Sequence, residues 1–314
     1  MKEAQVCDSV LAIRPCRFQA NVETAASNAF QASAPWEDAK ASNAIAEAQF
    51  DGLIECLLRL HVNCVVVDDT PDPHTPDSIF PNNWMSTHAD GTVALYPMEA
   101  VNRRTERRSD VLTTLVDAHG FRIDRQVDLS SFEMNAHFLE GTGSLVLDRN
   151  HRLAYACLST RTHIEPLDEF DREMGYRSVR FVAKDASGQV IYHTNVMMCV
   201  GQDFCVLCED AMDAEDRVRV RDSLLETGHD IIPIGFDALN GFAGNMLALE
   251  DSRGQSVIAL SQQAFEALDA QQKRRLERYG SLAIADINHI ETQSGGSVRC
   301  MLAEIHLPKG SKVA

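Results

Sequence analysis

The stretch FLEGTGSLVLDRNHRLAYACLS, residues 138–159, contains the pattern that decides the fold of this chain. Two apolar runs flank a polar turn, which is typical of a β-hairpin. The same pattern returns at residues 79–97, 192–210 and 241–261. Amphipathic segments that fit helices lie between the hairpins, at residues 107–120, 165–176, 214–228 and 270–280. The repeating unit is therefore a β-hairpin followed by a helix.

A fifth copy of this unit is divided between the two ends of the chain. Residues 296–307 supply one apolar strand, residues 9–18 supply the other, and residues 41–61 supply a helix. Self-similarity at about 50 to 60 residues is typical of propellers and arrays, whose units pack against their neighbours. We therefore predict an α/β fold, a five-bladed α/β propeller, as a single catalytic domain over residues 1–314 with the ring closed by the terminal strands. The alternative is an open α/β sandwich whose hairpins only look alike.

Composition narrows the class of protein. The chain is 45% apolar and 24% charged, as an ordinary globular protein is. Its 46 acidic and 29 basic residues give a net charge of −17, which argues against binding to nucleic acid. No apolar run long enough for a membrane span and no signal peptide is evident, and the nine scattered cysteines indicate reduced thiols. We expect a cytoplasmic protein that does not bind membranes; the sequence leaves open whether it forms a homo-oligomer.

One residue from each hairpin copy occupies the same position of the repeat. These residues follow one another at intervals of 52 to 57 positions and are Asn83, Glu140, His193, Asn245 and Cys300. Equivalent positions converge on the axis of a propeller, so a thiol, an imidazole and a carboxylate should meet in one pocket. Such a set can serve as nucleophile, acid/base and orienting group. Taken alone, Cys300 would more often be a small buried apolar residue, but its position after Ser294-Gly-Gly and in register with His193 and Glu140 favours a nucleophile.

Four strings carry a family resemblance over nearly the whole chain. PDSIFPNNW, FLEGTGS, YHTN and SGGSVRCM resemble the motifs of arginine deiminases, dimethylarginine dimethylaminohydrolases and amidinotransferases, the guanidino-modifying (pentein) superfamily. Bacterial citrulline-utilisation hydrolases are the most similar, and residues 14–31 resemble them too. The resemblance implies a five-bladed propeller that acts without metal or cofactor. It also implies Cys300 as nucleophile, His193 as acid/base and Glu140 as its orienting group.

The same resemblance suggests residues that bind an amino-acid substrate. Arg103 and Arg161 resemble the arginines that hold the substrate in dimethylarginine hydrolases, and guanidinium groups suit a carboxylate. Either could equally be a solvated surface charge, and Arg104 competes with Arg103 for the role. Asp77 resembles an aspartate that binds one end of the substrate, although a turn residue after Pro76 fits it as well. We also count Asn83, Asn195 and Asn245 as substrate-binding candidates.

Two departures from the family pattern bear on the substrate. Relatives that process arginine carry carboxylates where this chain has Asn83 and Asn195. Amides both donate and accept hydrogen bonds, so the site suits a neutral group such as the ureido end of citrulline. The sequence therefore predicts a hydrolase that converts citrulline and water to ornithine, ammonia and carbon dioxide. The alternatives are an enzyme acting on arginine or methylarginine, and a non-catalytic pentein that only binds its ligand.

Overall fold

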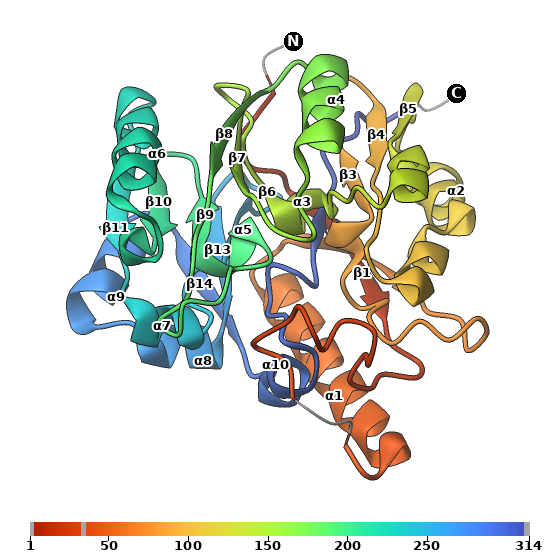
Figure 1. Ribbon diagram of the computed structural model, residues 1–314. Helices are drawn as coiled ribbons and strands as arrows, with labels where there is room; N and C mark the ends of the chain where they lie inside the picture. Colours follow the sequence, from red (N-terminus) through yellow and green to blue (C-terminus); the bar gives the residue numbers. More distant parts are fainter. Residues whose placement is uncertain (1–2, 33–35, 311–314) are drawn as a thin grey trace.

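The computed structural model describes residues 3–32 and 36–310. Its strands form five three-stranded sheets, and each sheet consists of an antiparallel strand pair joined by a parallel third strand. The five sheets surround the short helices α3 (Gly141–Ser144) and α5 (Thr194–Met197), which lie near the middle of the molecule in Figure 1. This arrangement confirms the predicted α/β propeller with five blades.

The first four blades follow one another along the chain, and each places a helix between its second and third strands. Blade one contains β3 (Met85–Thr87), β4 (Thr92–Leu95), α2 (Ser109–Asp117) and β5 (Arg125–Asp128). Blade two contains β6 (Leu145–Asp148), β7 (Leu153–Cys157), α4 (Ile164–Met174) and β8 (Arg177–Phe181). Blade three contains β9 (Met198–Val200), β10 (Phe204–Leu207), α6 (Ala214–Glu226) and β11 (Asp230–Pro233). Blade four contains β12 (Leu247–Glu250), β13 (Ser256–Ser261), α8 (Gln262–Ala267), α9 (Ala270–Leu276) and β14 (Ser281–Ala285).

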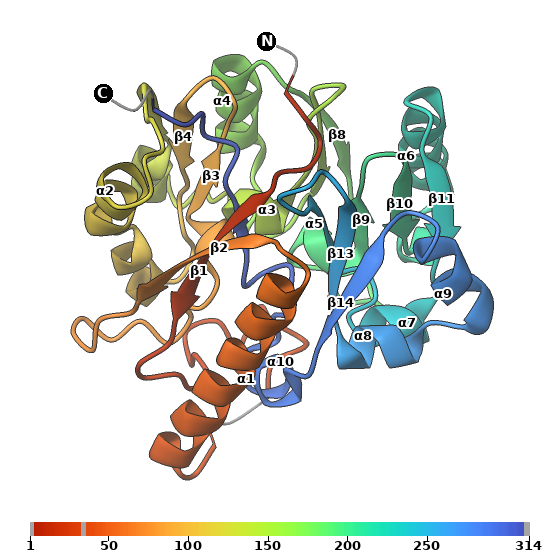
Figure 2. The same ribbon diagram turned by 180° about the vertical axis from the view of Figure 1, so that it is seen from behind.

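The fifth blade joins the two ends of the chain. Strand β15 (Ala303–Glu304) pairs antiparallel with β1 (Ser9–Arg14), and Val10 lies opposite Glu304. The long helix α1 (Ala39–Arg59) then leads to β2 (Asn63–Asp68), which is parallel to β1. Figure 2 shows this blade from behind, with α1 beside β14 of the neighbouring blade. The terminal strands therefore share one sheet, as predicted from the divided repeat.

The third strand of every blade was missing from the sequence prediction. In blade two the middle strand β7 is buried along its whole length, whereas β8 at the outer edge is partly exposed. A strand that returns from a helix must run parallel to the middle strand, because a crossover carries the chain back to the same end of the sheet. The outer strands are more exposed than the hairpin strands, so their apolar pattern is weaker.

Helix ends explain why the peripheral helices begin and stop where they do. The Asp213 side chain accepts a hydrogen bond from the backbone N–H of Asp216 at the start of α6, and Asp269 and Gln272 form a capping box on α9. Helix α4 ends at Gly175 with a φ of 68°, a conformation that glycine adopts without strain. Helices α1, α2, α4, α6 and α9 lie at the periphery in Figure 1. None of the helices in the described ranges has both the length and the hydropathy needed to cross a membrane.

Candidate active site

The five residues of the repeat position lie in the turns that precede the inner strands. Asn83 ends a 3₁₀ turn, η1 (Pro81–Asn83), while Glu140 and His193 directly precede α3 and α5. Asn245 comes just before β12, and Cys300 lies in a turn before β15. The hairpin ranges predicted from sequence include Glu140, His193 and Asn245, whereas the observed strands begin a few residues after them. The turns lie at equivalent ends of the inner strands of the blades, so the five residues still meet near the middle of the molecule.

His193 and Glu140 form a buried hydrogen-bonded pair. The distance from His193 Nε2 to Glu140 Oε2 is 2.9 Å, and the side chains are 4% and 1% exposed. Burial raises the pKa of Glu140, but Arg161, His193 and Arg103 outweigh it and hold this pKa well below its usual range. Glu140 is therefore a carboxylate at neutral pH. The other Glu140 oxygen, Oε1, accepts a hydrogen bond from the Glu99 backbone N–H at 3.0 Å, which fixes the carboxylate plane.

The charge state of His193 is set by two opposing effects. Burial, together with the nearby guanidinium groups of Arg161 and Arg103, lowers the pKa of His193 to about 4 overall. The hydrogen bond and negative charge of Glu140 raise it. The imidazole is therefore neutral at pH 7 in this structure, and Glu140 is the group that favours its protonated form.

Cys300 lies on the far side of the same site and contacts two side-chain amides. The Nδ2 groups of Asn195 and Asn245 lie 3.3 Å and 3.2 Å from Cys300 Sγ. No hydrogen bond joins Cys300 to His193 in the described part of the chain, yet both line one cavity. A substrate atom between them could meet the sulfur on one side and the imidazole on the other.

This cavity is narrow. Its free volume is about 20 Å³, which is room for about one water molecule. The walls come from both ends of the chain and from the first three blades, and consist of Asn28, Asp77, Phe80, Asn83, Arg103, Arg161, Tyr192, His193, Ser294, Gly296 and Cys300.

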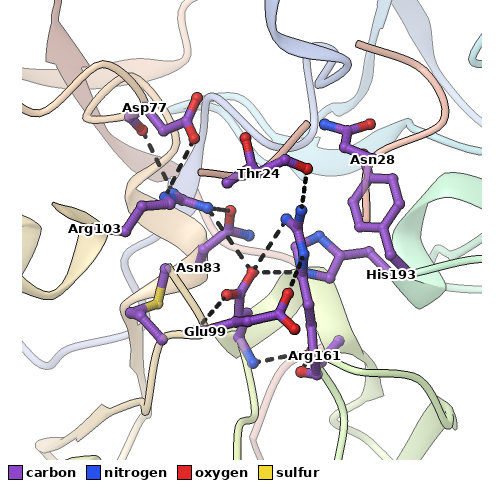
Figure 3. Close-up of polar contacts among 12 residues, drawn as sticks. Thr24, Asn28, Asp77, Asn83, Glu99, Arg103, Arg161 and His193 are labelled. Carbon is purple, nitrogen blue, oxygen red and sulfur yellow. Dashed lines mark hydrogen bonds and ion pairs between the residues drawn. The ribbon is translucent and has the colours of Figure 1, made fainter. Parts of the chain in front are cut away.

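Arg103 is buried between acidic and amide side chains (Figure 3). Its Nη2 lies 2.9 Å from Glu106 Oε2, its Nη1 donates to Asn83 Oδ1 at 2.9 Å, and its Nε lies 3.7 Å from Asp77 Oδ2. Arg104, the competing candidate, is 29% exposed and donates to the carbonyls of Met98 and Glu99 outside the cavity. Arg103 is thus the arginine that faces the site.

Arg161 lines the opposite wall. It lies 3.2 Å from Glu99 Oε2, donates to Ser27 Oγ at 2.7 Å and to the Thr24 carbonyl at 3.3 Å, and its guanidinium stacks over Tyr192 at 4.6 Å. Figure 3 shows Thr24 and Glu99 on either side of it. Neither Arg103 nor Arg161 is a solvated surface charge, but both already have carboxylate partners.

Asp77 has one free oxygen in the described structure. Its Oδ2 accepts a hydrogen bond from Asn21 Nδ2 at 2.8 Å, while its Oδ1 is buried without a partner among the described residues. Because a buried acceptor without a partner is costly, this oxygen is suited to a donor on a ligand. Asp77 is therefore more than the turn residue that its sequence position allowed.

Sequence reasoning missed several residues of the site. Thr24, Ser27 and Asn28 come from the segment between β1 and α1, and Asn28 Nδ2 donates to the Ser294 carbonyl at 2.8 Å. The signal was available in the family-like string of residues 14–31, which was not assigned to the site. Asn82 and Glu106 were also missed, and Glu106 supplies the carboxylate that pairs with Arg103.

One group of side chains among the described residues has the composition of a metal site. Cys7, Glu304 and His306 place their ligand atoms within 4.8 Å of one another. However, Arg299 lies 2.8 Å and Arg149 3.4 Å from the Glu304 carboxylate, so its charge is already compensated. The group shares no residue with the cavity that Cys300 and His193 line.

Comparisons with known proteins place the chain among enzymes with this architecture. A family model described as "N,N dimethylarginine dimethylhydrolase, eukaryotic" matches residues 14–307. Curated proteins give no significant sequence match.

Solved structures give strong matches of fold. Apo ArgZ, an arginine dihydrolase from the ornithine-ammonia cycle in cyanobacteria, is 16% identical with a TM-score of 0.74 over 97% of this chain. The chain covers 42% of that ArgZ chain. AgrE in complex with ornithine and NAD⁺ is 17% identical with a TM-score of 0.71, over 97% of this chain and 40% of that chain. A dimethylarginine dimethylaminohydrolase variant with an S-methyl-L-thiocitrulline adduct is 15% identical with a TM-score of 0.62, over 95% and 99% of the two chains.

Proposed function

We propose a reaction from the premise that this chain belongs to the N,N-dimethylarginine dimethylhydrolase family of the pentein superfamily. Members of this family are cysteine-dependent hydrolases of carbon–nitrogen bonds, and the chain is an enzyme of that class. The proposed reaction is the hydrolysis of the ureido group of citrulline, which gives ornithine, ammonia and carbon dioxide.

The observation that carries this choice of substrate is the orientation of the Asn83 amide. Arg103 Nη1 can only donate a hydrogen bond, so the Asn83 atom that it contacts at 2.9 Å must be the carbonyl oxygen Oδ1. Nδ2 is left for other partners, and one of its hydrogens bonds Asn82 Oδ1 at 3.2 Å. The amide therefore offers a donor at the cavity wall, which suits the carbonyl oxygen of a ureido group. A cationic guanidinium has no such acceptor, and it would also lie near the Arg103 charge.

The chemistry follows from the positions of the thiol and the imidazole. The Cys300 thiol passes its proton to His193 and attacks the ureido carbon as the thiolate. The bond from that carbon to the δ-nitrogen of ornithine then breaks while the protonated His193 donates that proton to the leaving amine. A carbamoyl group remains on the sulfur. Water then attacks this group, His193 accepts the proton of the water, and the carbon–sulfur bond breaks to release carbamate, which decomposes to ammonia and carbon dioxide.

Glu140 supports both proton transfers without exchanging protons with the substrate. Its carboxylate holds His193 Nε2 and compensates the positive charge when the imidazole is protonated. The backbone N–H of Gly296 lies at the cavity wall and has only a long contact of 3.5 Å with Ser294 Oγ. It is thus a donor available for the oxygen of the tetrahedral intermediate.

Product analysis tests the proposal directly. Purified protein is incubated separately with citrulline, arginine and N,N-dimethylarginine, and ornithine, citrulline, ammonia and dimethylamine are quantified. Ornithine from citrulline is the expected result. Citrulline formed from arginine or dimethylarginine would instead support the arginine-type alternative, and no product from any substrate would support a non-catalytic ligand-binding protein.

Introduction of a negative charge at Asn83 tests the basis of the specificity. Asn83→Asp places a carboxylate against the neutral ureido oxygen, so citrulline turnover should fall by at least tenfold. Binding of arginine, measured as protection of Cys300 from alkylation, should improve relative to citrulline. An unchanged preference between the two ligands would show that Asn83 does not recognise substrate charge.

A further inference from the structure

The sulfur of Cys300 receives two hydrogen bonds from neutral amides. Asn195 Nδ2 lies 3.3 Å and Asn245 Nδ2 lies 3.2 Å from Sγ. These distances are normal for N–H groups that bind sulfur. Both asparagines were expected to bind substrate, but neither belongs to the cavity wall. Their donors point to the nucleophile instead.

The orientation of the Asn245 amide is fixed by two backbone groups. The backbone N–H of Arg299 donates to Asn245 Oδ1 at 3.0 Å, and Nδ2 donates to the Asn195 carbonyl at 2.9 Å. A backbone N–H cannot accept and a carbonyl cannot donate, so the amide cannot be reversed. Nδ2 must therefore face Cys300. The contact with the Arg299 backbone, next to Cys300 in the chain, also fixes the amide relative to the nucleophile's own turn.

This set of partners matches a thiolate better than a thiol. A thiol has one hydrogen to donate, but no described residue accepts a hydrogen bond from Cys300. Instead, two N–H donors point at the sulfur. A thiolate only accepts hydrogen bonds. By contrast, the buried thiols of Cys7 and Cys157 each donate to a backbone carbonyl, at Ser9 and Ile191.

Charged groups near the cavity do not take this role. The Arg103 guanidinium is paired with Glu106. The Arg161 guanidinium is paired with Glu99 and Glu140. Arg299 is paired with Glu304. His193 is bonded to Glu140, and the Tyr192 hydroxyl donates to the Gly295 carbonyl at 2.8 Å. Asp77 also borders the cavity, and its negative charge opposes a second anion. None of these groups forms a hydrogen bond with Sγ in the ranges that the structure describes.

We propose that Asn195 and Asn245 are catalytic residues that hold Cys300 as a thiolate by two neutral hydrogen bonds. This inference rests on the proposed role of Cys300 as nucleophile. A neutral pair has a clear advantage in this site, because it stabilises the anion without adding a cation that would repel the protonated His193. Asn195 can also serve as a hydrogen-bond acceptor, because its Oδ1 is buried without a partner among the described residues.

The pH dependence of Cys300 alkylation tests the proposal in the absence of substrate. Iodoacetamide reacts with the thiolate, so the rate of modification of the Cys300 peptide, followed by mass spectrometry, gives a midpoint pH. Asn195→Ala and Asn245→Ala should each raise this midpoint by about one pH unit, because a hydrogen bond to a charged group is worth about tenfold or more in an equilibrium constant. Asn195→Asp should raise it further by repulsion.

Two controls separate this role from a structural one. Asn63→Ala removes an exposed asparagine amide that donates to Ser9 Oγ at 2.9 Å and does not line the cavity, so it should leave the midpoint unchanged. Asn245 supports two backbone groups and its variant could unfold, but the described Asn195 side chain makes only the contact with Cys300, so Asn195 variants remain informative. Midpoints that stay within 0.2 pH units (about 1.6-fold) of wild type in folded Asn195→Ala and Asn195→Asp would overturn the proposal. Because no substrate is present, that outcome is distinct from a failure to hydrolyse citrulline.

Discussion

Replacing Gly143 with alanine should disrupt catalysis far more than folding. A Cβ at this position would lie 2.5 Å from Asn83 Nδ2, 2.7 Å from His193 Nδ1 and 2.8 Å from His193 Cε1. Ordinary contacts begin at 3.4 Å, so the imidazole must retreat by about 0.7 Å and the amide by about 0.9 Å. Neither group moves freely, because Glu140 holds the ring and Arg103 holds the amide.

A shift of this size has a predictable effect on rate. Misplacing a catalytic group by about 1 Å can cost on the order of 100-fold, so kcat for citrulline should fall by about that factor. Overpacking of a buried site costs about 1–3 kcal/mol, and the backbone of Gly143 does not have a left-handed φ, so alanine adds no backbone strain. The protein should therefore remain folded.

Two other glycines provide matched controls. Gly188→Ala meets no atom within 4 Å but has a φ of +86°, so it should cost some stability and no activity. Gly141→Ala combines a φ of +46° with a Cβ only 2.2 Å from the backbone oxygen of Asn82, so it should lower the melting temperature most. The assay is steady-state kinetics on citrulline together with thermal unfolding of all three variants. A folded Gly143→Ala protein with kcat within threefold of wild type would refute the reasoning, because His193 and Asn83 would then tolerate displacement.

Three further outcomes are expected. Cys300→Ser should abolish turnover with an unchanged melting temperature, because serine is a far poorer nucleophile at neutral pH; turnover near the wild-type rate would remove Cys300 from its role. Glu140→Gln should lower kcat by about 10²–10⁴-fold and move the His193 titration, followed by NMR, to still lower pH, since the Glu140 charge raises the His193 pKa. Burial raises the pKa of Glu291 from 4.5 to about 7, so between these pH values the folded state binds a proton that the unfolded state has lost. The free energy of unfolding should therefore fall by up to about 3 kcal/mol as the pH rises through this range. Glu291→Gln keeps an acceptor for Ser297 Oγ and should remove that pH dependence in urea unfolding at pH 5 and pH 8, whereas an equal slope in both proteins would assign it to other groups.

The proposed role of Asn195 makes this residue unsuitable for a test of substrate specificity. Asn195→Asp would bring a carboxylate to the Cys300 sulfur, so any loss of activity would combine a weaker nucleophile with altered substrate recognition. Asn83 does not contact the sulfur in the described structure, and its Oδ1 is held by Arg103. Asn83→Asp alone is therefore the cleaner test of citrulline against arginine.

Local sequence patterns were sufficient for much of the fold. The four intact hairpins and the helices between them appear where alternating apolar runs and polar turns predicted them, because hairpins and amphipathic helices depend on residues close in sequence. The divided fifth repeat could be inferred as well, since its two halves match a pattern that the other copies define. The outer strands were missed because they are more exposed than the hairpin strands and so carry a weaker apolar pattern, as in β5 and β8. The short helical turns α3 and α5 were also missed, because four residues are too few to show a helical period.

For the site as well, one part could be predicted from the sequence and another part depends on the tertiary structure. The repeat position by itself brought Asn83, Glu140, His193, Asn245 and Cys300 into register, because one side chain per blade meets near the axis whatever the detailed packing. What those side chains contact was decided only in three dimensions. That Asn195 and Asn245 face the sulfur, and that Arg103 turns the Asn83 amide, depends on hydrogen bonds between residues 20 to 105 positions apart. Hydrogen bonds depend on distances and angles between atoms from different blades, and a sequence pattern specifies neither.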